Sequence, residues 1–286
     1  MSNAVLPQHA AQPATPTDTL PTRWAAADGA MSPGRFLLYV SYACPWSHRV
    51  LIARALNGLE DAVEVVDVEP EMDELGWRLE GSHLADRYRT YVPGYAGKAS
   101  VPLMVEVAAG QVVSNESADL TRMLGTLIRG SGEPLFPAMH AAACDTWNDD
   151  IQMNVNKRIY QFGFGATDEE KIMKTRALME TFLRLDHALA KRVYLVTDEA
   201  PLEPDWRLLT TLARYDLAYR PFMLSADAVP LAAFTNLARF CAELLAVPGI
   251  SATYRPDEIA RHYSARLRDF KPGLSNHHSL QETKDA

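Results

Sequence analysis

The chain has 286 residues, 48% of them hydrophobic, and a net charge of −8 from 28 Lys and Arg against 36 Asp and Glu. This length is enough for two domains of roughly 100–200 residues each. The acidic balance without a basic cluster argues against nucleic acid and anionic membrane surfaces as partners, and no apolar run approaches the ~18–20 residues that cross a bilayer.

The cysteines and the chain ends predict a cytoplasmic protein. Three cysteines make an odd, sparse set, which favours a reducing compartment over a disulfide framework. The first basic residue is Arg23, so the N-terminus lacks the charged region of a signal or transit peptide. No spacing of Cys and His resembles a metal site, and we expect no metal. We expect residues 1–30 to be a disordered arm and residues 266–286 a polar tail.

Residues 31–128 are predicted to form a small α/β domain. Residues 35–40 are a short apolar run with β-branched and aromatic side chains, which indicates a buried strand. A helix is predicted over residues 45–56, because proline suits the first turn of a helix and Asn57-Gly58 is a usual stop. Residues 62–68 are predicted to be a second strand, which completes a βαβ unit.

A hairpin and a helix are predicted to follow a polar stretch in this domain. Residues 101–107 and 111–113 are apolar segments on either side of Gly110, a pattern typical of a hairpin. The sequence leaves the isomer of the Val101–Pro102 bond open. A helix begins near Glu116. The order β-α-β-β-β-α is that of a thioredoxin-like domain.

Residues 138–265 are predicted to be an all-helical domain, with Pro134 and Pro137 in the linker before it. Thr167 and Glu170 form a capping box that opens a long helix with one apolar face. Residues 193–196 are interpreted as a connector. Further helices are predicted over residues 139–160, 205–215, 231–245 and 256–263.

Cys44 lies between the first strand and the first helix, in the segment Tyr42-Ala43-Cys44-Pro45-Trp46-Ser47. Free N–H groups and the positive end of the helix dipole favour the thiolate there, and the thiolate is the nucleophilic form. Ser47 stands where a dithiol enzyme has its resolving cysteine, so an external thiol must resolve a mixed disulfide on Cys44. The alternative for a lone cysteine is a structural role in the core, which we expect for Cys144 and Cys241.

Six sequence elements occur in one order along the chain: Tyr42-Ala43-Cys44-Pro45-Trp46-Ser47-His48-Arg49, Gly76-Trp77-Arg78, Val101-Pro102, Asn115-Glu116-Ser117, Ile159-Tyr160-Gln161-Phe162-Gly163-Phe164 and His262-Tyr263. Together they resemble the glutathionyl-hydroquinone reductases, the Xi class of glutathione transferases. The similarity runs from about Trp24 to Tyr263. It implies the glutathione transferase architecture, a thioredoxin-like α/β domain followed by an all-α domain, and a homodimer.

The resemblance implies glutathione as co-substrate and quinone-derived aromatic compounds as substrates. It implies Cys44 as the catalytic nucleophile, with Tyr160 and Tyr263 facing the aromatic substrate. It also implies a glutathione site made by Trp77, Lys98, Val101, Pro102, Glu116 and Ser117. A helix start with a hydroxyl suits a carboxylate on physical grounds too; the alternative is that Glu116 and Ser117 only cap the helix.

Several positions depart from the family pattern, and three of them bear on the predicted site. Family members usually carry Ala, Arg and a second Tyr where this chain has Ser47, Lys98 and Ser264. Lysine at position 98 replaces a bidentate carboxylate contact by a point charge. These departures leave glutathione binding better supported than hydroquinone specificity.

The predicted reaction is the reduction of glutathionyl-hydroquinones through a Cys44 mixed disulfide that a second glutathione resolves. One alternative is a general monothiol transferase, acting in deglutathionylation or dehydroascorbate reduction. A conjugating transferase that activates glutathione with Tyr42 or Ser41 is less favoured, because a cysteine at that place prefers to form a disulfide. A non-catalytic scaffold with the transferase fold is the remaining alternative.

Overall fold

A four-stranded sheet organises the first half of the chain in the computed structural model, which describes residues 16–20, 32–127, 134–160 and 167–269, with side chains as far as residue 265. The strand order is β2-β1-β6-β7, with β1 parallel to β2 and antiparallel to β6, and β6 antiparallel to β7. The predicted thioredoxin-like arrangement is confirmed. The strands are β1 Phe36–Val40, β2 Val63–Asp67, β6 Leu103–Glu106 and β7 Gln111–Ser114.

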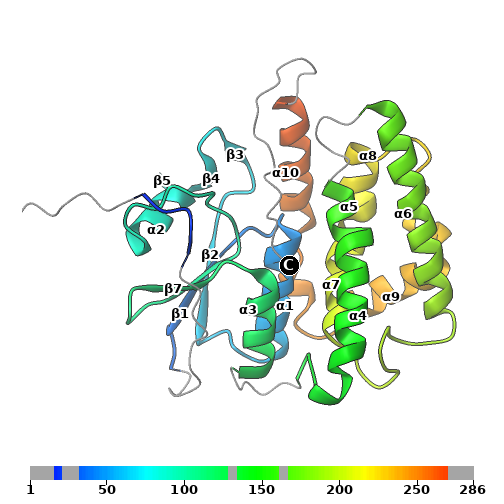
Figure 1. Ribbon diagram of the computed structural model, residues 1–286, viewed down its shortest axis with the longest axis horizontal. Coiled ribbons are helices and arrows are strands. Elements are labelled where there is room, and N and C mark those ends of the chain that lie inside the picture. The colour runs from blue at the N-terminus through cyan, green and yellow to red at the C-terminus, as the bar shows by residue number, and fades with distance from the viewer. Residues whose placement is uncertain (1–15, 21–31, 128–133, 161–166, 270–286) are drawn as a thin grey trace, which may run out of the picture.

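Side chains of β1 alternate between two cores on opposite faces of the sheet. Phe36 and Leu38 belong to the core on the face covered by α1 (Pro45–Leu56) and α3 (Ser117–Arg122), which continues as the π-helical turn η1 (Met123–Leu127). Tyr39 belongs to the second core, beneath α2. In Figure 1, α1 and α3 lie between the sheet and the helical half.

The polar stretch between β2 and β6 contains elements that the sequence prediction missed. Three strands of two to four residues form a separate sheet in the order β3-β4-β5, and α2 follows them. Such short strands offer too few alternations to reveal a period of two. The elements are β3 Met72–Asp73, β4 Gly76–Leu79, β5 Ser82–His83 and α2 Leu84–Tyr91.

The second half is helical, as predicted. The capping box is present, because the Thr167 hydroxyl accepts the N–H of Glu170 and the Glu170 carboxylate accepts that of Thr167. Residues 193–196 form no strand and connect two helices. The elements are η2 Ala138–His140, α4 Ala141–Ile151, η3 Gln152–Asn156, α5 Lys157–Tyr160, α6 Asp168–Leu189, α7 Glu203–Arg214, η4 Tyr215–Tyr219, α8 Arg220–Met223, η5 Leu231–Ala233, α9 Thr235–Leu245, η6 Ser251–Thr253 and α10 Pro256–Asp269.

One hydrophobic core runs through both halves. It contains Phe36 and Leu38 of the sheet together with Leu178 and Phe182 of α6. Helix α1 lies at the junction, between the sheet and α7 (Figure 1). Cys144 and Cys241 are buried, which confirms the prediction that they belong to the interior.

Residues 16–20 are the described part of the predicted N-terminal arm. Thr17 forms a parallel bridge with Tyr95, donating its N–H to the Gly94 carbonyl and accepting that of Ala96. This segment therefore pairs with the first domain, which the composition of the arm did not indicate. The rest of the arm, the tail from residue 270 and the Gln161–Phe164 part of the family motif lie outside the described residues.

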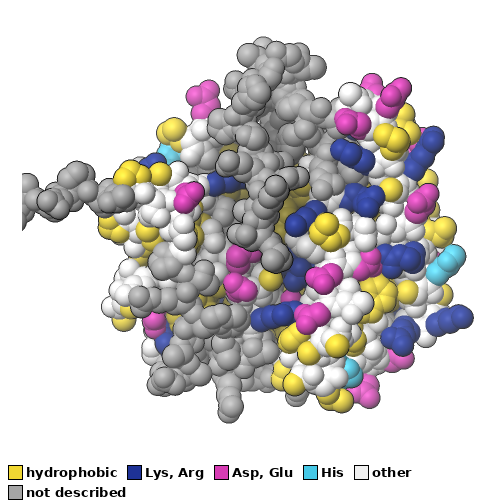
Figure 2. Space-filling view, in the orientation of Figure 1, with side chains coloured by type: hydrophobic (Ala, Val, Ile, Leu, Met, Phe, Trp, Pro, Cys, Tyr) yellow, Lys and Arg dark blue, Asp and Glu magenta, His cyan; other side chains and the backbone are white. Residues whose placement is uncertain are grey.

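Charges of both signs are interspersed on the surface. Figure 2 shows Lys and Arg side chains alternating with Asp and Glu over the helical half, so this face has no extended field of one sign. Within the described ranges, none of the helices has the length and apolar character that crossing a bilayer requires.

Candidate active site

Cys44 is the N-cap residue of α1, at the end of the turn that follows β1. Its backbone is extended and its side chain makes no capping hydrogen bond with the helix. The residue is 8% exposed, and its Sγ lies 3.7 Å from the Val101 carbonyl oxygen, to which the thiol can donate. The predicted position of the sulfur at a helix N-terminus is confirmed, and the site is partly shielded from water.

Arg214, at the end of α7, holds the turn that carries Cys44. Its side chain is fully buried and donates to the carbonyl oxygens of Tyr42 at 2.8 Å, Ala43 at 3.0 Å and Cys44 at 3.4 Å. Ser41 serves the N–H groups of the same turn: its hydroxyl accepts from Ala43 and its carbonyl from Cys44. The sequence analysis missed Arg214, because nothing local marks a contact across 170 residues.

His48 extends this arrangement as a neutral imidazole. The Thr253 hydroxyl donates to the Ile250 carbonyl, so its oxygen accepts the Nε2–H of His48 at 3.0 Å. The Nδ1 of His48 then accepts from Arg214 at 2.9 Å. Complete burial, together with the charge of Arg214, holds the pKa of His48 well below its ordinary value and keeps the ring neutral.

The loop before β6 and the turn after β7 meet beside Cys44. The Val101–Pro102 peptide bond is cis, and Val101 is buried. The Tyr88 hydroxyl donates to the Ser100 carbonyl at 2.7 Å and accepts from the Asn115 amide at 3.2 Å. Tyr88 of α2 therefore fixes both segments that the family resemblance assigns to glutathione, although the sequence analysis did not single it out.

Glu116 and Ser117 lie at the start of α3 as predicted. The Glu116 side chain makes no capping bond, so the idea that it merely caps the helix finds no support. Burial, reinforced by Asp119, raises the pKa of Glu116, whereas the charge of Arg49 opposes this rise. Arg49 of α1 is 4% exposed and donates to Asn156 at 2.6 Å; burial and the charge of Arg207 lower its pKa to about 9.

Trp77 has a neighbour that the sequence analysis did not foresee. Its indole stacks on the His262 ring with centroids 5.2 Å apart and planes 13° apart, and the His262 Nδ1 donates to the Pro70 carbonyl at 2.6 Å. His262 precedes Tyr263 in α10, so one short stretch of that helix contacts both Trp77 and Tyr160. Lys98 is exposed, and its carbonyl accepts the Tyr95 hydroxyl at 3.1 Å.

Tyr160 and Tyr263 are brought together, and a third tyrosine joins them. Their hydroxyl oxygens lie 2.6 Å apart, and the Tyr219 hydroxyl lies 3.2 Å from that of Tyr160. Trp46, two residues after Cys44, packs on the Tyr160 ring with centroids 4.7 Å apart. Tyr219 lies in the π-helical turn η4, and no local sequence pattern predicts its contact with Tyr160.

Burial dominates the titration of these tyrosines. It raises the pKa of Tyr160, and the neighbouring Tyr219, Tyr263 and Cys44 add to the rise. It also raises the pKa values of Tyr219 and Tyr263. All three hydroxyls therefore stay protonated near neutral pH and can act as hydrogen-bond donors.

Comparisons with known proteins agree with this architecture. Residues 43–127 match the family model described as the glutathione S-transferase N-terminal domain. The glutathionyl-hydroquinone reductase YqjG of Escherichia coli is 32% identical to this chain, and the match covers 87% of this chain and 83% of YqjG. The glutathionyl-hydroquinone reductase PcpF of Sphingobium chlorophenolicum is 30% identical, over 81% of this chain and 78% of PcpF. The chain belongs to the glutathionyl-hydroquinone reductase family.

The glutathione-bound structure of YqjG superimposes with a TM-score of 0.78, at 32% identity, over 85% of this chain and 86% of that one. Membership in the glutathionyl-hydroquinone reductases makes this protein an enzyme of the glutathione-dependent oxidoreductase or transferase type. The expected transferase architecture is confirmed.

The positions of Ser41 and Tyr42 test the alternative that a hydroxyl beside Cys44 activates glutathione for conjugation. Ser41 is fully buried and its hydroxyl is used inside the turn, while the Tyr42 ring lies 3.5 Å from the Arg255 guanidinium carbon. Both side chains are thus engaged in structural contacts. Neither arrangement favours activation of a glutathione thiol by a hydroxyl at this place.

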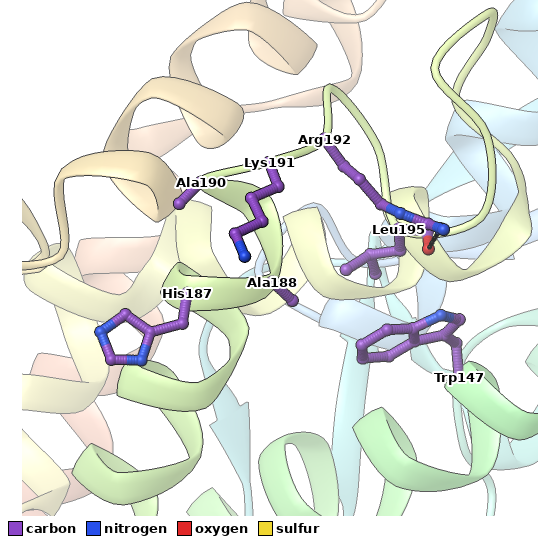
Figure 3. Close-up of a pocket in the computed structure, with 7 residues that line it drawn as sticks. All are labelled: Trp147, His187, Ala188, Ala190, Lys191, Arg192 and Leu195. Atoms are coloured by element: carbon purple, nitrogen blue, oxygen red, sulfur yellow. Dashed lines mark hydrogen bonds between the residues drawn. The ribbon is translucent and has the colours of Figure 1, made fainter.

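A surface cavity of about 530 Å³ lies elsewhere on this reductase-family enzyme (Figure 3). Its wall joins α4, the end of α6 and the connector after it, and it shares no residue with the Cys44 site. Figure 3 shows the Arg192 side chain directed to the Leu195 carbonyl, with Trp147 below. The residues that line it are Trp147, His187, Ala188, Ala190, Lys191, Arg192 and Leu195.

Proposed function

We propose that this enzyme reduces glutathionyl-hydroquinones to hydroquinones at Cys44. The observation that carries the proposal is a buried cysteine at the start of α1, two residues before a tryptophan that packs on Tyr160 in a cluster of three tyrosine hydroxyls. A cysteine without a resolving partner suits a mixed disulfide with glutathione. Protonated hydroxyls suit the oxygen substituents of a hydroquinone ring.

Glutathione is proposed to bind along the first domain. The Val101 backbone would pair with its cysteinyl part, next to Pro102, and Trp77 would pack against the peptide. Glu116 would accept from the α-ammonium group and Ser117 would donate to the γ-glutamyl carboxylate. Lys98 would meet a carboxylate as an exposed point charge.

In the proposed first half-reaction, the Cys44 thiolate attacks the sulfur of the glutathionyl group. A sulfur–sulfur bond forms, the bond between that sulfur and the ring carbon breaks, and the electron pair of the broken bond goes to the ring. The ring carbon takes up a proton, which completes its reduction. Tyr160 and Tyr263 donate hydrogen bonds to the ring oxygens and supply the proton through their hydroxyl chain.

The tyrosine cluster is suited to that proton transfer in one further respect. A phenolate at Tyr160 would have two hydroxyls, those of Tyr219 and Tyr263, within hydrogen-bond distance to stabilise it. In the second half-reaction, the thiolate of another glutathione attacks the mixed disulfide. Oxidised glutathione leaves and the Cys44 thiolate is restored.

The test is turnover of a glutathionyl-hydroquinone by wild type and by Cys44→Ser, with Cys144→Ser as the control for loss of a buried thiol elsewhere. We expect C44S to lose activity by at least about a thousandfold, since a nucleophile is essential. C144S should keep wild-type turnover. Undiminished turnover by C44S would refute the proposal.

A general monothiol transferase is the second candidate, and position 264 favours keeping it. Where relatives have another tyrosine this chain has Ser264, whose hydroxyl donates to the Arg261 carbonyl within α10. The site thus has one aromatic hydroxyl fewer for a hydroquinone. Comparing kcat/KM for a glutathionyl-hydroquinone with that for a glutathione mixed disulfide would separate the two activities.

A further inference from the structure

We infer that Arg214 is a positioning residue for Cys44: from the helical half, its guanidinium fixes the turn that presents the nucleophile. The inference deepens the proposed function and rests on the proposed role of Cys44. It is carried by the hydrogen bonds from one fully buried arginine to three successive carbonyl oxygens of that turn.

Hydrogen bonds hold both the N–H groups and the carbonyl groups of the turn that carries Cys44. The hydroxyl and carbonyl of Ser41 accept the N–H groups of Ala43 and Cys44, while Arg214 takes the carbonyls on the other side. The Cys44 carbonyl also accepts the first helical N–H, that of His48. The two peptide planes before Cys44 are thus held from both edges, and the Cys44 carbonyl is held as well, which fixes the direction of the side chain.

The Arg214 guanidinium is itself immobilised by contacts with both halves of the molecule. Arg214 donates to the Thr210 carbonyl one turn back along α7, at 2.8 Å, and to the His48 ring, which Thr253 orients in turn. The planar fork of an arginine can serve several acceptors in fixed directions, whereas an ammonium group cannot. A lysine at position 214 could therefore not make the same set of hydrogen bonds.

Charge adds to the geometry. The described partners of the Arg214 side chain are carbonyl oxygens and a neutral ring nitrogen, so no carboxylate among them neutralises it. A thiolate at a residue only 8% exposed loses most of its hydration. A fixed positive charge behind the turn offsets part of that loss.

Arg207, two turns earlier on α7, offers a matched control. It is also buried, yet it donates to the Glu203 carboxylate and to Gln152 and does not touch the Cys44 turn. Glu203 keeps a second partner in Arg122, so the loss of Arg207 leaves that carboxylate paired. Replacing either arginine by lysine therefore disturbs a buried site in α7. Only the replacement of Arg214 removes hydrogen bonds to the turn that carries Cys44.

The experiment compares R214K and R207K in the full-length enzyme, with melting curves to confirm folding. The first readout is the rate of Cys44 alkylation by iodoacetamide at neutral pH, with the site identified by peptide mass spectrometry. We expect R214K to lower both the alkylation rate and the kcat on a glutathionyl-hydroquinone by about tenfold or more, because a small displacement of the nucleophile lowers the reaction rate steeply. The KM for glutathione should change by less than about twofold, since Arg214 contacts none of the residues proposed to bind it.

R207K should alkylate like wild type. Equal alkylation rates in R214K, R207K and wild type would overturn the inference. If R214K does not fold, His48→Ala decides, because it keeps the arginine and removes the ring that fixes one of its nitrogens; slower alkylation is expected, and an unchanged rate again overturns the inference. Alkylation needs no substrate, so failure of the proposed reaction, seen as full activity in C44S, is a separate outcome.

Discussion

At the scale of single residues, Tyr219 tests whether the hydroxyl cluster works as a unit. Its ring is fully buried, so its contribution passes through the bond to Tyr160. We expect Tyr219→Phe to lower kcat on a glutathionyl-hydroquinone by about fivefold, the equivalent of one neutral hydrogen bond near 1 kcal/mol. The measurement is steady-state kinetics, with Tyr215→Phe as control.

Tyr215 suits that comparison because its hydroxyl donates to the Val229 carbonyl, away from Cys44. Y215F should lose stability without losing kcat. If both variants showed the same kcat as wild type, Tyr219 would be a packing residue and the cluster would reduce to the pair of Tyr160 and Tyr263.

The buried imidazole of His48 predicts how stability depends on pH. In the unfolded chain the ring takes up a proton near pH 6.5, whereas in the folded protein its pKa lies well below that value. Below pH 6.5 the unfolded state therefore binds more protons, and the free energy of unfolding falls by up to about 1.4 kcal/mol per pH unit until the folded pKa is reached. This stabilising effect is complete above pH 6.5.

Melting temperatures of wild type and His48→Gln between pH 7.5 and 5 measure this effect. Burial raises the pKa of Asp67 to about 6 and that of Asp205 to about 7, which gives slopes of the opposite sign. Both proteins share these carboxyls, so the difference between the curves isolates His48. We expect the gap to narrow as the pH falls, and parallel curves would show that the ring does not titrate on unfolding.

At the scale of elements, the local signals of the sequence predicted most of the fold. The βαβ unit, the hairpin and the capping box of α6 each depend on residues close together in the chain. The strands β3 to β5 escaped prediction, because segments this short acquire their pairing only from the folded surroundings. The local pattern of hydrophobic residues was thus sufficient to predict an element wherever the helix or strand is long enough to show its periodicity.

The residues of the candidate site also differ in whether local sequence predicted them. Cys44 and the turn at Glu116 were predicted from a strand, a helix start and their residue types. Arg214 and Tyr219 were not, because each reaches the site from a distant helix and each looks like an ordinary helical residue in sequence. His262 belongs to a family motif, but its stacking on Trp77 was not predicted. Tertiary packing, which a single sequence does not display, decides those contacts.

At the scale of the whole molecule, the shared core predicts that both halves unfold together. Leu208 of α7 is fully buried in that core, whereas Leu183 of α6 is 50% exposed. We expect Leu208→Ala to lower the free energy of unfolding by about 2–5 kcal/mol, and Leu183→Ala by no more than about 0.5 kcal/mol. Both variants should still unfold in one calorimetric transition.

That single transition has a consequence for the chemistry. If the sheet and the helices were separate cooperative units, L208A would split the transition in two, and Cys44 could stay ordered after the helical half had unfolded. Because Arg214 holds the cysteine turn from α7, we expect instead that Cys44 alkylation and the loss of helical circular dichroism follow one curve as denaturant is added. Two curves with separate midpoints would contradict the single core, since the nucleophile would then be ordered by the first domain alone.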